Sequence, residues 1–165
     1  MNILKRIDKA LTRFEGYVLI TLLFIMVVMA FLQVVLRNLF SSGILWADPF
    51  LRHLLLWLGF LGAAIATSEN RHINIDALRR FFSKRMRSAV EVLTDSFAAV
   101  ICFMLSQASW TFVQGEIADR RVLFGDIPSW YAQVIIPIGF GLLVVHFAIR
   151  ALLHVWVAAG KGEIE

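Results

Sequence analysis

Two acidic residues within a predicted helix are the first candidates for chemistry. Glu91 and Asp95 are four residues apart, so they share a helix face, and Arg87 lies four residues before Glu91. Carboxylates in an apolar helix could relay a proton or a cation. Both lie within two turns of the end of that helix, where they can reach water or pair with basic residues of the preceding loop. We therefore expect a structural role for both, through such pairing, rather than a role in transport.

The histidines and the cysteine are weaker candidates for chemistry. Membrane cytochromes hold haem through paired imidazoles at one depth, and only His72 and His146 could share a depth, although His72 falls in a polar run beyond its span. The single cysteine, Cys102, cannot form an internal disulfide, and no Cys/His grouping has metal-ligand spacing. We expect no metal, no cofactor, no catalytic residue and no enzymatic activity.

A bilayer is the solvent that the composition favours. The chain has 165 residues, of which 59% are hydrophobic and 17% charged, and its mean hydropathy is +0.76. About 20 apolar residues suffice to cross a hydrocarbon core of roughly 30 Å. The apolar runs predict four transmembrane helices within one integral membrane domain, residues 1–165, over approximately residues 16–36, 50–68, 88–114 and 127–149. Pro137 should kink the last of them.

The basic residues predict the orientation of these spans. Twelve of the sixteen lysines and arginines fall in the N-terminal segment, the loop between spans two and three, and the C-terminal tail. This bias predicts that both termini and the middle loop are cytoplasmic, an N-in/C-in topology. Because the basic residues flank apolar spans, orientation and anionic lipid explain the high pI better than nucleic acid does.

Two segments are expected to lie along the membrane surface as short interfacial amphipathic helices, at residues 3–14 and 77–87. In each, apolar residues recur at helical spacing between basic ones. The second would place basic side chains against lipid headgroups: Arg79, Arg80, Lys84, Arg85 and Arg87. A solvated basic loop is the alternative. The predicted fold class is thus an all-α membrane protein with four spans and interfacial helices.

The second span has a stripe of small residues that favours close helix packing. Gly59, Gly62, Ala63 and Ala66 repeat at intervals of three and four after Trp57. The partner helix could belong to this chain or to another protein. No inverted repeat and no pair of broken helices is visible, features that mark many complete transporters. The chain therefore has the characteristics of a subunit.

The run from Trp57 to Leu78, with its His72-Ile-Asn-Ile-Asp76 segment, resembles the signature of the small (Q) membrane subunits of tripartite ATP-independent periplasmic (TRAP) transporters. Ile127-Pro-Ser-Trp-Tyr131 and Ile136-Pro-Ile-Gly-Phe-Gly-Leu142 resemble the last span of that family, of the DctQ and SiaQ type. Members often have paired acidic residues before the arginine of span two, whereas this chain has Asp48-Pro49.

The resemblance implies a sodium-coupled importer of the bacterial inner membrane for an organic acid, such as a C4-dicarboxylate or sialic acid. A periplasmic solute-binding protein would deliver the acid to a large multispan subunit, which would contain the substrate and sodium sites. This chain would act as its scaffold. It also implies that outward-facing residues contact the binding protein; the candidates are Arg37, Asp48, Arg52, Arg120 and Arg121.

Two other functions stay open. One is a membrane-anchor cytochrome or redox subunit, which requires haem ligands. The other is a small autonomous exporter that acts as an oligomer through Glu91.

Overall fold

Four long helices dominate the computed structural model, which describes residues 2–68 and 84–158. They are α1 (Asn2–Phe40), α2 (Ala47–Ser68), α4 (Lys84–Ala118) and α6 (Ile135–Ala158). Each is long and apolar enough to cross a membrane. The prediction of an all-α membrane protein with four spanning helices is therefore confirmed.

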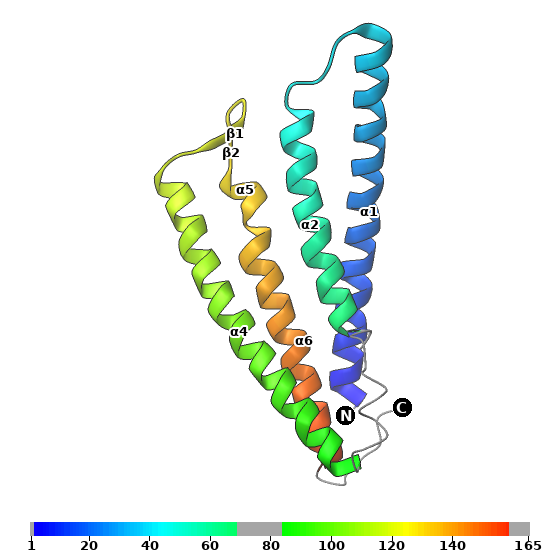
Figure 1. Cartoon of the computed structure of the whole chain (residues 1–165), viewed down its shortest axis with the longest axis vertical. Coiled ribbons are helices and arrows are strands. Elements are labelled where there is room, and N and C mark those ends of the chain that lie inside the picture. Colours follow the sequence, from blue (N-terminus) through cyan, green and yellow to red (C-terminus); the bar gives the residue numbers. More distant parts are fainter. Residues whose placement is uncertain (1, 69–83, 159–165) are drawn as a thin grey trace.

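The helices lie side by side in the order α1, α2, α6, α4 (Figure 1). α6 packs most extensively on α4 and next on α2, while α1 packs mainly on α2. The start of α1, the end of α2, the start of α4 and the end of α6 meet at one end of the molecule. We call this the α6-cluster end, for the polar residues described below, and the opposite end the hairpin end.

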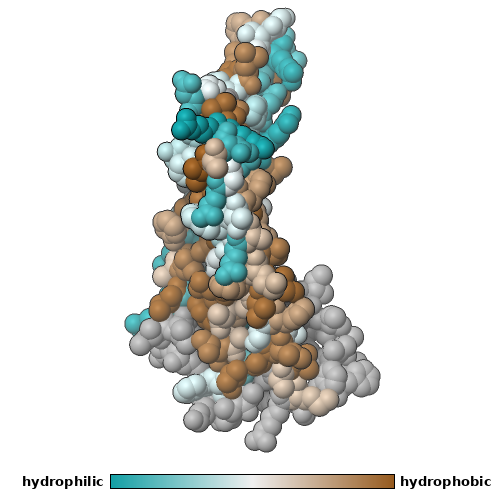
Figure 2. Space-filling model, turned by 90° about the vertical axis from the view of Figure 1, so that its left-hand side faces the viewer, coloured by the Kyte–Doolittle hydropathy of each residue, from teal (hydrophilic) through white to brown (hydrophobic). Residues whose placement is uncertain are grey.

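Large apolar side chains cover the outside of this arrangement. On α1 and α4, Phe24, Phe31, Phe97 and Met104 are all exposed. On the α4 side, hydrophobic residues cover much of the lower half of the molecule, and hydrophilic residues gather toward the hairpin end (Figure 2). Exposed apolar surface on this scale would be unstable in water but is suited to lipid or to another membrane subunit.

The predicted interfacial helix over residues 3–14 is wrong as a separate element. Residues 2–40 form one continuous helix: the stretch contains no proline, and the helix runs through its single glycine, Gly16, without a break. Most of the second predicted interfacial helix, residues 77–83, lies outside the described residues, and residues 84–87 form the first turn of α4.

The last predicted span begins later than expected. Residues 127–128 form β2 (Ile127–Pro128), which pairs antiparallel with β1 (Val122–Phe124), and Gly125 makes the turn between them at φ +55°. A short helix, α5 (Trp130–Gln133), then precedes α6. The helix is interrupted at Val134, where Pro137 lacks the N–H that would bond to the Gln133 carbonyl.

Gly139 allows α2 and α6 to approach closely. A Cβ atom at this position would overlap the ring of Phe60 on α2. The Phe60 ring also meets Phe140 edge to face, with ring centroids 5.1 Å apart. This contact sets the spacing of the two central helices.

Candidate functional site

Three residues of α6 lie on one helix face because they follow one another at intervals of four: His146, Arg150 and His154. All three have carboxylate partners on other helices. Together with those partners they form what we call the α6 cluster: Asp8, Thr12, Glu15, Thr67, Ser68, Glu91, Asp95, His146, Arg150 and His154.

His146 joins α6 to α1. Its Nδ1 lies 2.8 Å from Asp8 Oδ1, and its Nε2 lies 3.1 Å from Glu15 Oε1. The His146 side chain is 0% exposed and that of Glu15 2%. An imidazole donates through both nitrogens only when it is protonated, so this geometry suits an imidazolium held between two carboxylates.

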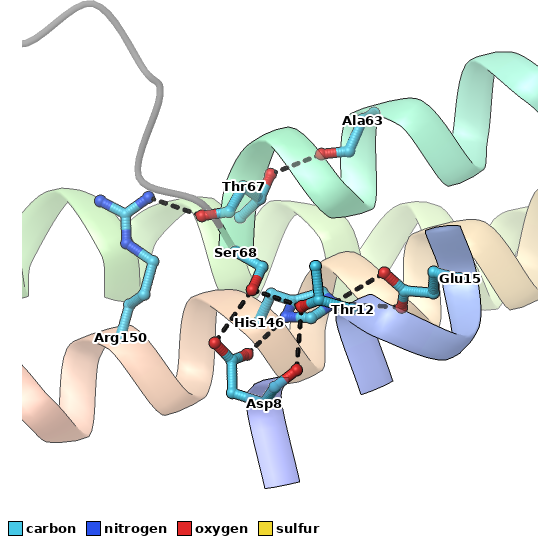
Figure 3. Close-up of polar contacts among 8 residues, drawn as sticks. All are labelled: Asp8, Thr12, Glu15, Ala63, Thr67, Ser68, His146 and Arg150. Atoms are coloured by element: carbon cyan, nitrogen blue, oxygen red, sulfur yellow. Dashed lines mark hydrogen bonds and ion pairs between the residues drawn. The ribbon is translucent and has the colours of Figure 1, made fainter. Parts of the chain in front are cut away.

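Asp8 extends the cluster to the end of α2 (Figure 3). Ser68 Oγ donates to Asp8 Oδ2 at 2.9 Å, and Thr12 Oγ1 lies 2.5 Å from Ser68 Oγ. Thr12 and Asp8 are four residues apart on α1, which places both side chains on the face toward α2. The first turns of α1, the last turn of α2 and α6 are thus connected by polar contacts.

Arg150 and His154 connect α6 to α2 and α4. Arg150 Nη1 donates to the Thr67 carbonyl at 3.2 Å, and its Nη2 lies 3.4 Å from Asp95 Oδ1. His154 lies 3.0 Å from Glu91 Oε2 through Nδ1 and 3.6 Å from Asp95 Oδ2 through Nε2. The two acids singled out in the sequence therefore pair with α6, in addition to any partner in the preceding loop.

A buried charge is tolerated only where a partner of opposite charge or several hydrogen bonds compensate its desolvation. The α6 cluster provides such partners from four helices, so it fixes their relative positions. Within residues 2–68 and 84–158, no group of three or more histidine, cysteine or acidic residues could hold a metal ion. The arrangement is suited to holding helices together.

A smaller cluster lies at the opposite end, and we call it the hairpin cluster: Glu116, Arg121, Ser129 and Gln133. Glu116 is 5% exposed and accepts hydrogen bonds from Ser129 Oγ at 2.7 Å and Gln133 Nε2 at 3.3 Å. Arg121 Nη1 lies 3.1 Å from Glu116 Oε1. These contacts hold the β1–β2 hairpin and α5 against the end of α4.

The packing residues predicted on α2 separate into a half-buried group, which includes Trp57, and an exposed group. Trp57 Nε1 donates to the Ala132 carbonyl at 2.9 Å, at the break between α5 and α6. Gly62, which lies beside Leu19 of α1, and Ala66 are half-buried. Gly59 and Ala63 are exposed, so their contact with another protein stays a prediction.

The predicted outward-facing residues lie at the hairpin end, and among the described residues no ion pair joins one of them to another. Arg37, Asp48, Arg52 and Arg120 are exposed. Arg121 is paired with Glu116 and Asp119. Gln33, by contrast, is buried and bonds both the N–H and the carbonyl of Ile44, which closes the connection between α1 and α2.

The predicted headgroup contacts cannot be placed. Arg79 and Arg80 lie outside the described residues, as does His72. Lys84, Arg85 and Arg87 belong to α4, but their side chains are also outside the described set.

Sequence reasoning missed the polar residues that contribute most to the α6 cluster. Asp8 lies within the stretch predicted to form an interfacial helix, and nothing in the local sequence pattern singles out Glu15 or Glu116. A signal was present, since His146, Arg150 and His154 recur every four residues in an otherwise apolar helix. Such a row on a spanning helix requires carboxylates on its neighbours.

The chain matches known proteins over most of its length. A family model described as the DctQ component of tripartite ATP-independent periplasmic transporters matches residues 26–157. A putative TRAP transporter small permease protein of Haemophilus influenzae is 30% identical over 88% of this chain and 89% of that protein.

More distant relatives have names that state a substrate. The C4-dicarboxylate TRAP transporter small permease protein DctQ of Pseudomonas aeruginosa is 27% identical over 62% of this chain and 51% of that protein. The sialic acid TRAP transporter permease protein SiaT of H. influenzae is 25% identical over 44% of this chain and 11% of that protein. With four spanning helices and a match to the family model over most of its length, the chain belongs to the DctQ family, the small permease subunits of TRAP transporters.

Proposed function

We propose that this small permease subunit acts as a rigid scaffold for the large permease subunit of its transporter. The α6 cluster is the observation that supports this role. It connects all four helices through buried ion pairs and hydrogen bonds, and every described ionisable group in it has a partner on a neighbouring helix. A part of a transporter that must stay fixed while another part moves benefits from such cross-connection.

The large subunit would cover part of the exposed apolar surface. Gly59 and Ala63 lie four residues apart on one exposed face of α2, where another helix could approach closely. One relative supports a tight association between such a segment and a longer membrane chain. The 72 residues that match the SiaT permease make up only 11% of that protein, so a segment like this one occurs there within a chain several times longer.

We infer that the transported solute is an organic acid and that the complex is sodium-coupled. Relatives are named for C4-dicarboxylates and for sialic acid, and all of these solutes are carboxylates. Sodium coupling rests on the resemblance to the family. Substrate and sodium would bind the large subunit, so this chain itself needs no cofactor.

The transporter would lie in the bacterial inner membrane, with the hairpin end in the periplasm. The exposed residues Arg37, Asp48, Arg52 and Arg120, together with the partly paired Arg121, would then be available to a solute-binding protein. The anionic lipids of the cytoplasmic leaflet would face the basic segments at the other end.

The geometry does not favour a haem-binding subunit. Both ring nitrogens of His146 lie on carboxylates, and Nδ1 of His53 bonds the Pro49 carbonyl at 2.8 Å. An exporter working through Glu91 is likewise not favoured, because Glu91 pairs with His154 on the neighbouring helix.

Reconstitution tests the proposal directly. Proteoliposomes should take up a radiolabelled carboxylate only when this chain, a large permease subunit and a binding protein are combined under an inward sodium gradient. Gly59→Leu and Ala63→Leu should weaken co-purification with the large subunit. Gly115→Leu on α4, where a Cβ also meets no neighbouring atom, is the matched control. Full transport by this chain alone would refute the scaffold role.

A further inference from the structure

A cavity of about 450 Å³ opens between the first turns of α1 and the last turn of α2. Its lining combines basic, acidic and hydroxyl side chains with a small apolar surface: Asp8, Lys9, Thr12, Arg13, Gly16, Ile65 and Ser68. It lies beside the α6 cluster, with which it shares Asp8, Thr12 and Ser68. The interactions described so far do not use the cavity itself.

The charged residues of the lining differ in whether they already have bonding partners. Asp8 already bonds His146 and Ser68. Lys9 and Arg13 are exposed, one turn apart on α1, and neither makes an ion pair among the described residues. Two uncompensated cations beside a cavity attract an anion, and the hydroxyls of Thr12 and Ser68 add hydrogen-bonding capacity.

The depth of the cavity identifies the kind of anion. Gly16 is the first residue of the long uncharged run of α1, so the lining changes from charged to apolar at the boundary where hydrocarbon begins. Ile65 continues the apolar surface from α2. An anion at this level that is attached to an apolar group would satisfy both parts of the lining at once.

We propose that this cavity binds the headgroup of an anionic phospholipid of the cytoplasmic leaflet. Its phosphodiester would lie between Lys9 and Arg13, and its acyl chains would begin along Gly16 and Ile65. With Asp8 counted, the lining has a net charge of +1, which one phosphodiester neutralises. The site differs from the general attraction of the basic loop to lipid, because it is a cavity with a defined lining.

The first test measures affinity. The full chain in detergent micelles is titrated with phosphatidylglycerol, and bound lipid is followed by native mass spectrometry. Arg13→Gln should weaken binding about fivefold and the Lys9→Gln/Arg13→Gln pair about 30-fold, the changes expected for one and two basic residues near an anionic headgroup. Arg6→Gln is the matched control, because Arg6 is an exposed arginine two turns before Arg13 and outside the lining. It should change affinity less than about twofold. Equal losses for Arg6→Gln and Arg13→Gln would indicate diffuse attraction and overturn the proposal.

A second variant fills the cavity without changing its charge. A Cβ at Gly16 meets no atom within 4 Å, so Gly16→Leu can be accommodated and should occupy the apolar part of the cavity. We expect it to weaken phosphatidylglycerol binding at least tenfold, which corresponds to about 1.4 kcal/mol of binding free energy. Gly115→Leu, at the other end of the molecule, should leave binding unchanged. Undiminished binding in Gly16→Leu would place the lipid elsewhere.

A third measurement separates a lipid from a free anion. A phosphatidylglycerol probe with a photoreactive headgroup should label peptides that contain residues 8–16 and 65–68. Excess inorganic phosphate should not reduce this labelling, because it lacks the acyl chains. Labelling abolished by inorganic phosphate would identify a site for free phosphate and would refute the lipid assignment.

Discussion

The two polar clusters at opposite ends of the molecule differ in how far apart their members are in the sequence. In the α6 cluster, His146 meets Asp8 across 138 residues and Glu15 across 131. In the hairpin cluster, Glu116 meets Ser129 and Gln133 across 13 and 17 residues. The first connects four helices, whereas the second holds one hairpin and α5 on the adjacent helix end.

This difference indicates where the molecule is held together. At the α6-cluster end, ion pairs join α6 to α1 and α4, and hydrogen bonds join α2 to α1 and α6. At the hairpin end, an apolar groove of about 330 Å³ separates the α1–α2 pair from the hairpin and α5, and its lining includes Leu22, Trp57 and Tyr131. The hydrogen bond from Trp57 to the Ala132 carbonyl joins the two sides of this groove. We infer that the α6-cluster end is the more rigid one.

Replacing His146 should have the largest effect. His146→Ala leaves the carboxylates of Asp8 and Glu15 without their shared partner, and an uncompensated buried charge costs about 3–5 kcal/mol. We expect the free energy of unfolding in detergent to fall by that amount, measured by thermal or denaturant unfolding. His53→Ala is the control, because His53 makes a local bond to Pro49 four residues earlier. A similar loss for both variants would contradict a special role of the α6 cluster.

Gly139→Ala should have the next largest effect. The added Cβ overlaps the Phe60 ring, and overpacking of this kind costs about 1–3 kcal/mol. A smaller residue at position 60 should recover part of the loss, so the Phe60→Ala/Gly139→Ala pair should be less destabilised than the sum of its single variants. Strictly additive losses in this double-mutant cycle would show that the added Cβ and the Phe60 ring do not interact.

Glu116→Gln should act locally at the hairpin end. It removes the charge that pairs with Arg121 and weakens the bonds from Ser129 and Gln133, at a cost of about 1–2 kcal/mol. Hydrogen exchange should accelerate in residues 119–133 and stay unchanged in residues 8–16. Faster exchange at both ends would mean that the two clusters are coupled.

Trp57→Phe should produce the smallest change. It retains the ring and removes the N–H that bonds the Ala132 carbonyl, which costs about 1 kcal/mol. The loss should appear as faster exchange around the break at Val134. Trp110→Phe provides a control, since Trp110 lies on α4 and is about half exposed. Equal effects of the two substitutions would argue against the contact between α2 and α5.

The sequence by itself determined the class of the protein. Four apolar runs of sufficient length require helices in a bilayer, because a backbone in hydrocarbon must satisfy its hydrogen bonds internally. The family resemblance also followed from the sequence, since Trp57, Pro137 and Gly139 occur at distinctive spacings. A shared structural role of Glu91 and Asp95 could also be inferred, because residues four apart lie on the same helix face.

Only the tertiary structure decided which partners these residues have. Helical periodicity states which side chains share a face, but it does not state which helices are neighbours. The pairing of Asp8 and Glu15 with His146 depends on the order α1, α2, α6, α4 and on how far each helix is displaced along its axis. The β1–β2 hairpin was missed for a related reason: its turn at Gly125 and its attachment to Glu116 are set by contacts between segments, and the apolar residues there resemble the start of a span.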